Sequence, residues 1–405
     1  MKSIITLIIF ILASNQIGIS QWEDRSISTS DPVQSVDFWN EDLGFVIVAD
    51  KIYKTTDGAE NWEVSYDHPT SLLLRDITFV EEEVLIAVGF DFNMNSNIVL
   101  KSTDLGENWN LVSSISNFIL NSLFFTSSTT GFVCGSSGML YKTVDAGSSW
   151  NQIVTDTGLT LNSVHFVNDS VGVIVGGQPL NSIILKTING GDEWNPIEPP
   201  TNDYLQSVYF VTEQTGYAVG WNGVIIKTED CGSTWNVQNP VEMVGNIKVF
   251  FTDELTGYVA GGQMDVTSIQ KTIDAGETWE DISPEYSIGL MDLYFPSFDI
   301  GYVVGIGGLV LKTENGGVIL STSNLKSNES VSLYPNPAWN QVYVEVENEK
   351  KIQKIEIYDH KGQLIKTNSM NISSFNLDVS NLQSGIYYLN ILSSNDSTLK
   401  QLVVK

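Results

Sequence analysis

A short pattern that recurs seven times constrains the fold of this chain more than any other feature. The first copy reads KTTDGAENW and starts at Lys54. The other copies start at Lys101, Lys142, Lys186, Lys227, Lys271 and Lys312. Successive lysines are 47, 41, 44, 41, 44 and 41 residues apart. A repeat of about 40 to 50 residues that is rich in short strands is typical of a β-propeller blade.

Each repeat contains further apolar segments upstream of this pattern. In the fifth repeat, LQSVYF starts at Leu205, GYAVG at Gly216 and VIIKT at Val224. Apolar residues that alternate with polar ones between Gly, Asn and Asp predict short strands. We therefore expect four strands per repeat: A (LQSVYF), B (GYAVG), C (VIIKT) and D, which is the tryptophan of the pattern with the residues after it.

The pattern itself has the chemistry of a tight turn between strands C and D. Its Asp or Asn can accept a backbone N–H across the turn, and its Gly supplies a positive φ. Its Trp is a large apolar group that can pack between adjacent sheets. Because the same residues recur in almost every repeat, we assign them structural roles, and the repeated Lys is expected to lie along the sheet. The structural positions are Asp57, Asp104, Asp145, Asn189, Asp230 and Asp274, with Trp62, Trp109, Trp150, Trp194, Trp235 and Trp279.

The seventh copy indicates how the ring closes. It reads KTENGG and has no tryptophan after its glycines, whereas the segment QWEDRSIST from Gln21 resembles a D strand. We infer that Trp22 supplies the missing D strand of the last blade. N- and C-terminal segments would then share one sheet, which leaves few exposed strand edges. Seven blades would occupy residues 21–320.

The repeat is similar to that of two known families. The S/T-x-D-x-G-x-x-W turn resembles the Asp-box (BNR) repeat of sialidases and related propellers. The longer unit, VxF…GxxVG…KTxDGG..W, resembles the photosystem II stability/assembly factor family of seven-bladed propellers. The resemblance covers nearly three quarters of the chain and implies an all-β, seven-bladed propeller. It says little about function, because one fold supports many functions.

The N-terminus predicts export. Lys2 precedes an apolar run of about ten residues, and small residues at Gly18 and Ser20 place a cleavage site before Gln21. Residues 1–20 are therefore interpreted as a signal peptide. The run is too short to span a bilayer, so no membrane insertion is expected.

The C-terminal 75 residues predict a second domain. After a polar linker at 321–330, residues 331–405 contain seven short segments of strand character, which indicate a small Ig-like β-sandwich. This segment resembles the type A C-terminal sorting domain of the type IX secretion system. The matching features are Pro335, Asn336 and Pro337, then IYDHKGQLIK and LDVSNLQSGIYYLNI with turn glycines Gly362 and Gly385, and the basic end KQLVVK. The resemblance implies transit through the periplasm, passage across the outer membrane by the type IX machinery, and removal of the domain during export. The alternative is an ordinary Ig-like binding module.

Charge excludes several classes of partner. The chain has 48 acidic and 20 basic side chains and a formal charge of −28. Residues 21–320 carry 40 acidic and 11 basic groups, a net charge of −29, whereas residues 331–405 carry seven of each. Nucleic acids and anionic membranes require basic patches, so neither is an expected partner. The role of photosystem assembly factors also implies a basic patch, and we interpret that resemblance as one of fold.

The sequence identifies no catalytic constellation. The sialidase resemblance implies three arginines, and this chain has only Arg25 and Arg75. Xyloglucanase-like Asp-box enzymes imply two facing propellers, and one is encoded here. His68, His165 and His360 are scattered, so neither a metal nor another cofactor is expected. Cys134 fits a buried strand position, and no bridge to Cys231 is expected. Glu81, Glu82 and Glu83 predict a solvated turn, with weak calcium binding as the alternative.

These observations favour a secreted or cell-surface propeller that binds a protein or glycan without catalysis. The alternative is a secreted glycoside hydrolase or lyase with an unrecognised carboxylate pair. In an A–B–C–D meander, B–C and D–A loops share one face, and A–B turns share the other with the Asp boxes. Longer loops are expected in blades 2, 4 and 6, and variable loops on a rigid scaffold are common binding sites. The candidate ligand-binding residues are Phe90, Phe92, Met94, Trp221 and Met264 in the B–C loops, of which Trp221 lies in the short turn of blade 5, with Arg75, Lys248, Asn121, Asn162 and Gln206 at the channel mouth.

Overall fold

The computed structural model describes residues 22–405 except 68–70, 116–118, 239–244, 264–265, 285, 318–330, 347–350, 359–363, 384 and 394–395. The described residues form strands and three short 3₁₀ turns, and no helix among them is long and apolar enough to cross a membrane. The strands belong to two compact units. The first comprises Trp22–Gly317, and the second contains the strands from Val331 onward.

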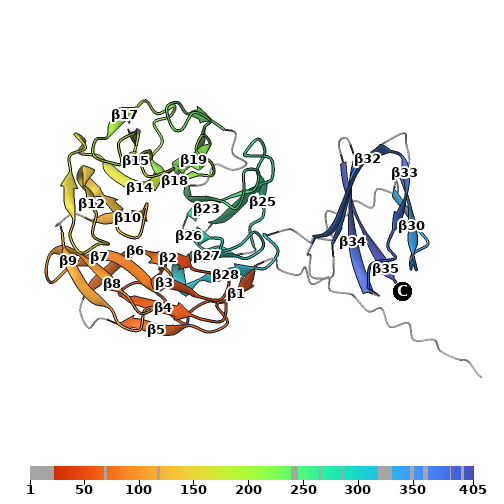
Figure 1. Ribbon diagram of the computed structural model, residues 1–405, viewed down its shortest axis with the longest axis horizontal. Coiled ribbons are helices and arrows are strands. Elements are labelled where there is room, and N and C mark those ends of the chain that lie inside the picture. Colours follow the sequence, from red (N-terminus) through yellow and green to blue (C-terminus); the bar gives the residue numbers. More distant parts are fainter. Residues whose placement is uncertain are drawn as a thin grey trace, which may run out of the picture. The chain divides into compact units, whose positions relative to one another are not determined.

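The first unit is a ring of seven four-stranded antiparallel sheets (Figure 1). Blade 1 has β2 (Val33–Phe38), β3 (Gly44–Val48), β4 (Lys51–Thr55) and β5 (Glu63–Asp67). Blade 2 has β6 (Leu72–Glu81), β7 (Val84–Asp91), β8 (Ser96–Ser102) and β9 (Asn110–Ser114). Blade 3 has β10 (Leu120–Phe125), β11 (Gly131–Gly135), η1 (Ser136–Gly138), β12 (Leu140–Thr143) and β13 (Asn151–Ile153). Blade 4 has β14 (Thr160–Phe166), β15 (Gly172–Gln178), β16 (Asn181–Thr187) and β17 (Asn195–Ile197).

The remaining blades repeat this order. Blade 5 has β18 (Leu205–Phe210), β19 (Gly216–Gly220), η2 (Trp221–Gly223), β20 (Ile225–Thr228) and β21 (Asn236–Val237). Blade 6 has β22 (Asn246–Phe251), β23 (Gly257–Gln263), β24 (Val266–Thr272) and β25 (Glu280–Asp281). Blade 7 has β26 (Leu290–Tyr294), β27 (Gly301–Gly305), η3 (Ile306–Gly308), β28 (Val310–Thr313) and, from the other end of the unit, β1 (Glu23–Asp24). The seven-bladed propeller predicted from the repeat is confirmed.

The last blade closes as the sequence predicted. Strand β1 pairs with β28, with Glu23 opposite Lys312 and Asp24 opposite Leu311, and the two strands lie side by side in Figure 1. Trp22 is buried, and its Nε1 donates a hydrogen bond of 3.2 Å to the carbonyl of Ile282 in blade 6. The N-terminal segment therefore completes the ring.

The Asp-box turns are hydrogen-bonded within themselves, as expected. Asp145 accepts hydrogen bonds from the hydroxyl of Ser149 at 2.6 Å and from its backbone N–H at 2.8 Å. These bonds lower the pKa of Asp145. Thr143 donates its hydroxyl proton to the same carboxylate and accepts the N–H of Gly147, whose φ is +80°. The carboxylate is thus occupied by the turn.

Tryptophan and lysine of the pattern connect neighbouring blades. Trp194 lies edge-on to Phe166 of its own blade and to Phe132 of the preceding blade, with ring centroids 5.7 and 6.4 Å apart. Lys142 extends to the next blade, where its Nζ donates to the carbonyl of Gly190 at 2.8 Å and pairs with Asp192. The lysine therefore bridges blades, which is more than the packing along a sheet that we predicted.

The predicted longer loops of blades 2, 4 and 6 are instead longer hairpins. Strands β7 and β8, β15 and β16, and β23 and β24 have seven or eight residues each, whereas β11 and β12 have five and four. Asp91 pairs with Ser96 and Gln178 with Asn181, so the ladder continues almost to the turn. The cause is that the polar residues we assigned to loops continue the strand pairing.

The second unit is a sandwich of two sheets. Its strands are β29 (Val331–Tyr334), β30 (Gln341–Val346), β31 (Ile352–Tyr358), β32 (Leu364–Ile372), β33 (Ser374–Asp378), β34 (Gly385–Ser393) and β35 (Asp396–Val404). One sheet has the order β29-β30-β33 and the other β32-β31-β34-β35, and Val344 and Leu389 are among the buried residues that join them.

The Pro-Asn-Pro segment of this unit holds the last strand. The Asn336 side chain accepts the N–H of Val403 at 2.9 Å, and the peptide bonds before Pro335 and Pro337 are cis. Gly385 begins β34 rather than lying in a turn, and Gly362 lies outside the described residues.

Candidate functional site

A β-bulge in the innermost strand of every blade builds the candidate site. In β14 the pairing with β15 shifts between Leu161 and Ser163, so Asn162 is unpaired, and the other six innermost strands shift at the same place. A bulge places an extra residue in one strand and changes the direction of its side chain. As a result, the bulged residue and its successor both line the central channel. They are Gln34, Ser35, Arg75, Asp76, Asn121, Ser122, Asn162, Ser163, Gln206, Ser207, Ile247, Lys248, Met291 and Asp292, and they enclose a cavity of about 220 Å³.

The bulged residues form an outer ring of mostly amide side chains. Asn121 donates from Nδ2 to Asn162 at 3.4 Å, and Asn162 donates to the carbonyl of Leu205 at 2.7 Å. Arg75 donates from Nη1 to Gln34 at 3.4 Å, while its buried Nε has no partner among the described residues. Burial lowers the pKa of Arg75. All five residues predicted at the channel mouth thus lie around one cavity.

The residues after the bulges form an inner ring that joins neighbouring blades. Ser122, Ser163 and Ser207 accept the backbone N–H of Val164, Val208 and Val249 from the next blade, at 3.2 to 3.4 Å. Three blades have charged residues at this position instead, namely Asp76, Lys248 and Asp292. Sequence reasoning identified Lys248 but missed the two aspartates. Alignment of the seven repeats on the serine position would have revealed them.

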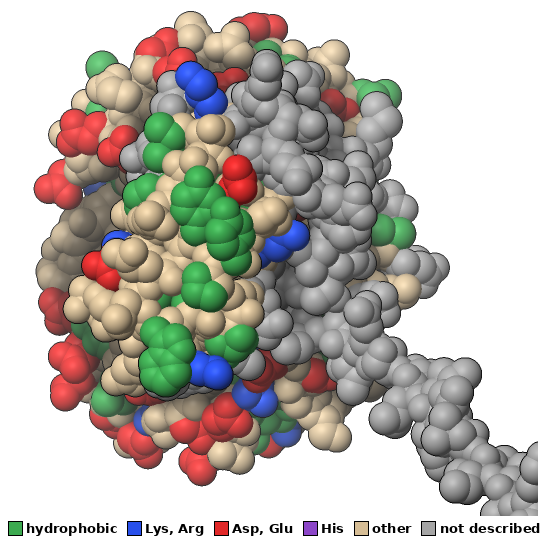
Figure 2. Space-filling view, turned by 90° about the vertical axis from the view of Figure 1, so that its right-hand side faces the viewer, with side chains coloured by type: hydrophobic (Ala, Val, Ile, Leu, Met, Phe, Trp, Pro, Cys, Tyr) green, Lys and Arg blue, Asp and Glu red, His purple; other side chains and the backbone are tan. Residues whose placement is uncertain are grey.

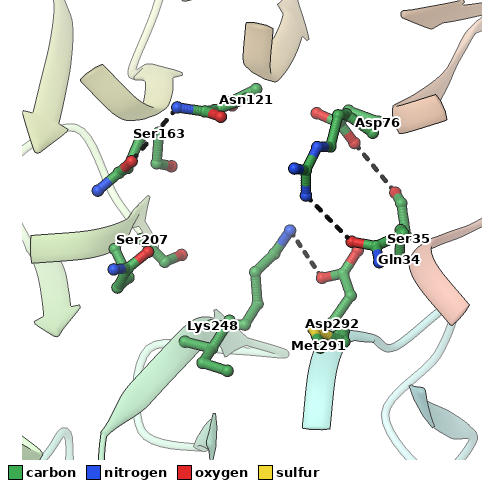
Figure 3. A pocket seen from close by; sticks show the side chains of 14 residues that line it. Gln34, Ser35, Asp76, Asn121, Ser163, Ser207, Lys248, Met291 and Asp292 are labelled. Atoms are coloured by element: carbon green, nitrogen blue, oxygen red, sulfur yellow. Dashed lines mark hydrogen bonds and ion pairs between the residues drawn. The ribbon is translucent and has the colours of Figure 1, made fainter. Parts of the chain in front are cut away.

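The three charged residues of the inner ring point into the same opening (Figure 3). Lys248 Nζ lies 2.8 Å from Asp292 Oδ1. Burial alone would lower the pKa of Lys248, but Asp292 and Asp76 raise it. Burial raises the pKa of Asp76 to about 6, and Asp292 adds to the rise while Lys248 opposes it.

Both carboxylates are occupied by structural hydrogen bonds. Asp76 accepts the N–H of Leu123 at 2.7 Å and the hydroxyl of Ser35 at 3.0 Å. Asp292 accepts the N–H of Val36 at 3.1 Å and binds Lys248 through its other oxygen. Asp76 and Asp292 therefore accept a backbone N–H from the next blade, as the serines of the other blades do. Carboxylates held in this way are poorly placed for acid–base catalysis.

A belt of rings narrows the channel below the cavity. The next inward-facing residues of β10, β14, β18 and β22 are Phe124, His165, Tyr209 and Phe250, whose adjacent ring centroids lie 4.9 to 5.0 Å apart. Burial lowers the pKa of His165 to about 4. Among the described residues, no group of three or more His, Cys, Asp or Glu side chains could hold a metal ion.

Asp37 of β2 lies at the same level of the channel as the belt of rings, and its burial predicts that the stability of the propeller depends on pH. Burial raises its pKa to about 7, against a hydrogen bond from the Phe79 N–H that lowers it. The folded state therefore binds this proton more tightly than the unfolded chain, and the free energy of unfolding falls as pH rises through about 7. We expect a loss of about 1 kcal/mol between roughly pH 6.5 and 8.5. The effect of Asp37 begins near pH 4, where the unfolded carboxyl loses its proton. Below about pH 6.5 the lowered pKa of His165 opposes this effect, because it makes stability rise with pH.

Denaturant unfolding at several pH values measures this slope. Asp37→Asn should abolish the loss above pH 6.5, because the amide keeps an acceptor for Phe79 but does not titrate. An identical slope in the variant and the parent protein would contradict the assignment to Asp37.

The face around the cavity carries the predicted aromatic residues. The N–H of Trp221, in the B–C turn, donates to the carbonyl of Tyr204, in the D–A loop, so these loops share a face as predicted. Trp221 is 46% exposed, and the Tyr204 hydroxyl bonds Asn162 of the cavity at 3.1 Å. Phe92 and Met94, in the turn between β7 and β8, are 58% and 51% exposed.

Two of the residues predicted in loops, Phe90 and Met264, are not found there among the described residues. Phe90 was predicted in a loop, but it lies in β7 and is buried, with its ring edge against Phe92. The reason is that the β7–β8 ladder extends past it. Met264 lies outside the described residues. Cys134 is buried, as expected, and Cys231 is partly buried; both thiols are free.

Comparisons with known proteins agree with this architecture. Residues 332–405 match the family model of the secretion system C-terminal sorting domain. Residues 113–202 and 192–286 match the model of the photosynthesis system II assembly factor YCF48. The chain combines an assembly-factor-like Asp-box propeller with a secretion sorting domain. Through this domain the assembly-factor-like propeller is secreted to the cell surface by way of the periplasm.

Solved structures resemble the propeller in fold. YCF48 from Cyanidioschyzon merolae has a TM-score of 0.60 and 20% identity, over 72% of this chain and 98% of that chain. A GH74 xyloglucanase from Xanthomonas campestris has a TM-score of 0.58 and 12% identity, over 80% of this chain and 59% of the enzyme. PorZ, a surface component of the type IX secretion system of Porphyromonas gingivalis, has a TM-score of 0.52 and 12% identity, over 95% of this chain and 58% of PorZ. A search of curated proteins finds no match.

Proposed function

We propose that this secreted propeller is a non-catalytic binding module whose ligand, a protein or a glycan, docks on the face of the B–C and D–A loops. The observation that carries the proposal is the cavity at the channel mouth, where bulges in seven strands direct polar side chains into one space. Exposed aromatic residues at Trp221 and Phe92 occupy loops of the same face. Variable groups on a rigid ring are a common arrangement for recognition.

The opposite face is a weaker candidate. Its Asp boxes are short turns that are closed by their own hydrogen bonds, and their backbone N–H groups bind the A–B turns, as between Ala146 and Thr129. The molecular surface is also strongly acidic: red side chains outnumber blue ones in Figure 2. Polyanionic partners are therefore disfavoured over the whole propeller.

A polysaccharide-active enzyme is the second candidate. Asp76 and Asp292 share one cavity, burial raises the pKa of Asp76 to about 6, and a xyloglucanase has the same fold. The hydrogen bonds that occupy both carboxylates argue against it. Incubating the mature protein with polysaccharides and measuring released reducing sugar distinguishes the two candidates. Release that disappears in Asp76→Asn or Asp292→Asn would establish the enzyme and overturn the binding proposal.

Exposed aromatic residues on the proposed face provide a direct test. If they are central contacts, Phe92→Ala and Trp221→Ala should each weaken ligand retention by about 1–3 kcal/mol. Retention on a protein and glycan array measures the effect. Phe298→Ala is a matched control, because Phe298 is 52% exposed and lies in an A–B turn on the opposite face. Loss of retention in Phe298→Ala alone would show that the other face binds.

A further inference from the structure

We infer that the channel mouth is a subsite for one neutral, hydroxyl-rich sugar ring, and that Trp221 and Tyr204 form an aromatic platform for the next part of the same glycan. This inference rests on the proposed function, since it names the ligand class of the same face. It follows from the size of the cavity, its unused hydrogen-bonding groups, its balanced charge and its aromatic edge.

The cavity has the size of a single small ring. Its volume is about 220 Å³, whereas pockets for drug-sized ligands have roughly 300–1,000 Å³. The belt around His165 narrows the channel behind it. A longer ligand must therefore place one terminal unit in the cavity and the remainder on the surrounding loops.

Several polar groups of the cavity have few or no hydrogen-bond partners among the described residues. The carboxamide of Gln206 makes no hydrogen bond to the residues that the structure describes, although it lines the cavity. Within the described part of the chain, the buried Nε of Arg75 has no partner, and the Gln34 carboxamide makes only the long contact to Arg75. A buried group without a partner, such as the Arg75 Nε, costs free energy unless a ligand or water bonds it. The carboxamides of Gln206 and Gln34 are half-buried, so they are open to a ligand in the cavity. Amides and a guanidinium offer donors and acceptors in fixed planes, which suits neighbouring hydroxyl groups.

The charge at the mouth disfavours a charged ligand of either sign. Arg75 and Lys248 are balanced by Asp76 and Asp292, and Lys248 already binds Asp292 at 2.8 Å. A cationic side chain would meet two cations and would find both carboxylates occupied by the backbone and Lys248. An anionic sugar would gain Arg75 but would approach a propeller whose net charge is −29.

An aromatic platform continues from the cavity. Asn162, which lines the cavity, bonds the Tyr204 hydroxyl at 3.1 Å, and the Tyr204 ring meets the Trp221 ring edge-on with centroids 5.4 Å apart. Trp221 is 46% exposed, so its surface is open to a ligand. Aromatic faces pack well against the apolar C–H surfaces of a sugar ring while the polar edge remains solvated.

Retention of the mature full-length protein on immobilised oligosaccharides tests the inference. The probes are oligomers of neutral hexoses, oligomers of uronic acids, and a lysine-rich peptide. We expect retention on at least one neutral oligomer, at least tenfold weaker in Trp221→Ala and in Gln206→Ala. The Gln206 variant removes no hydrogen bond of the described structure, so it should keep the parent melting temperature. Trp39→Ala is the matched control, because Trp39 is 43% exposed and lies in an A–B turn on the other face; its retention should change less than twofold.

Other outcomes distinguish the sugar subsite from the proposed binding function. Retention only on uronic acids or the peptide, or none on the neutral oligomers, would overturn the sugar subsite. If protein ligands from the array were then lost in Phe92→Ala and Trp221→Ala, the proposed function would stand without it. If Trp39→Ala rather than Trp221→Ala abolished retention, both the subsite and the proposed binding face would be wrong.

Discussion

Replacing Trp22 by alanine should cost about 3–5 kcal/mol of stability and lower the melting temperature by on the order of 10 °C. Trp22 is 1% exposed, and its indole bonds the Ile282 carbonyl of blade 6. Strand β1 contributes only two paired residues to the last sheet. The buried indole therefore supplies much of the contact that closes the ring, and the substitution leaves a cavity between the first and last segments of the propeller.

Scanning calorimetry of the parent protein and the variant measures this effect. Trp62→Ala is an informative control, because Trp62 has the equivalent position in blade 1 but is only partly buried and belongs to a blade built from one continuous segment. We expect it to cost clearly less. Equal losses in the two variants would mean that Trp22 acts as one more Asp-box tryptophan and not as the closure of the ring.

Removing residues 331–405 should stop export across the outer membrane, with the propeller accumulating in the periplasm. The expected loss from the cell surface and medium is nearly complete, because residues 332–405 match a sorting domain and the first unit has its own core. Immunoblots of the periplasmic, surface and medium fractions measure the distribution. Protease resistance of the retained protein checks that the propeller has folded.

A fusion supplies the complementary experiment. Residues 331–405 attached to a reporter with a signal peptide should send that reporter past the outer membrane. If the truncated protein still reached the surface, or if the fused reporter stayed in the periplasm, the segment would be an ordinary binding module rather than the sorting signal.

Much of the fold was predictable because it is specified locally. Each Asp-box turn needs its own Asp, Thr and Gly within a few residues, as Asp145, Thr143 and Gly147 show. The number of blades and the closure by Trp22 followed from counting these turns. The prediction for blade 2 was less accurate. Phe90 was expected in a loop, but pairing between Asp91 and Ser96 keeps it in a buried strand. Hairpin length depends on cross-strand partners, which a single segment does not reveal.

The candidate site also contains residues that the sequence could locate and residues that it could not. Its outer-ring members Arg75, Asn121, Asn162 and Gln206 could be located from the sequence, because they hold one position of a repeating strand.

The seven blades and their order could be read from the sequence, since they depend on patterns within each repeat, and so could the sorting domain at the C-terminal end. The meeting of Asp76, Lys248 and Asp292 at one level of the channel is visible only in the folded ring. They come from three blades, and their meeting depends on the ring closing and on a bulge directing each side chain inward. Among the described residues, the same geometry leaves the Arg75 Nε without a partner, whereas it occupies both carboxylates. Hydrogen-bond satisfaction is a property of the assembled ring and not of any single repeat.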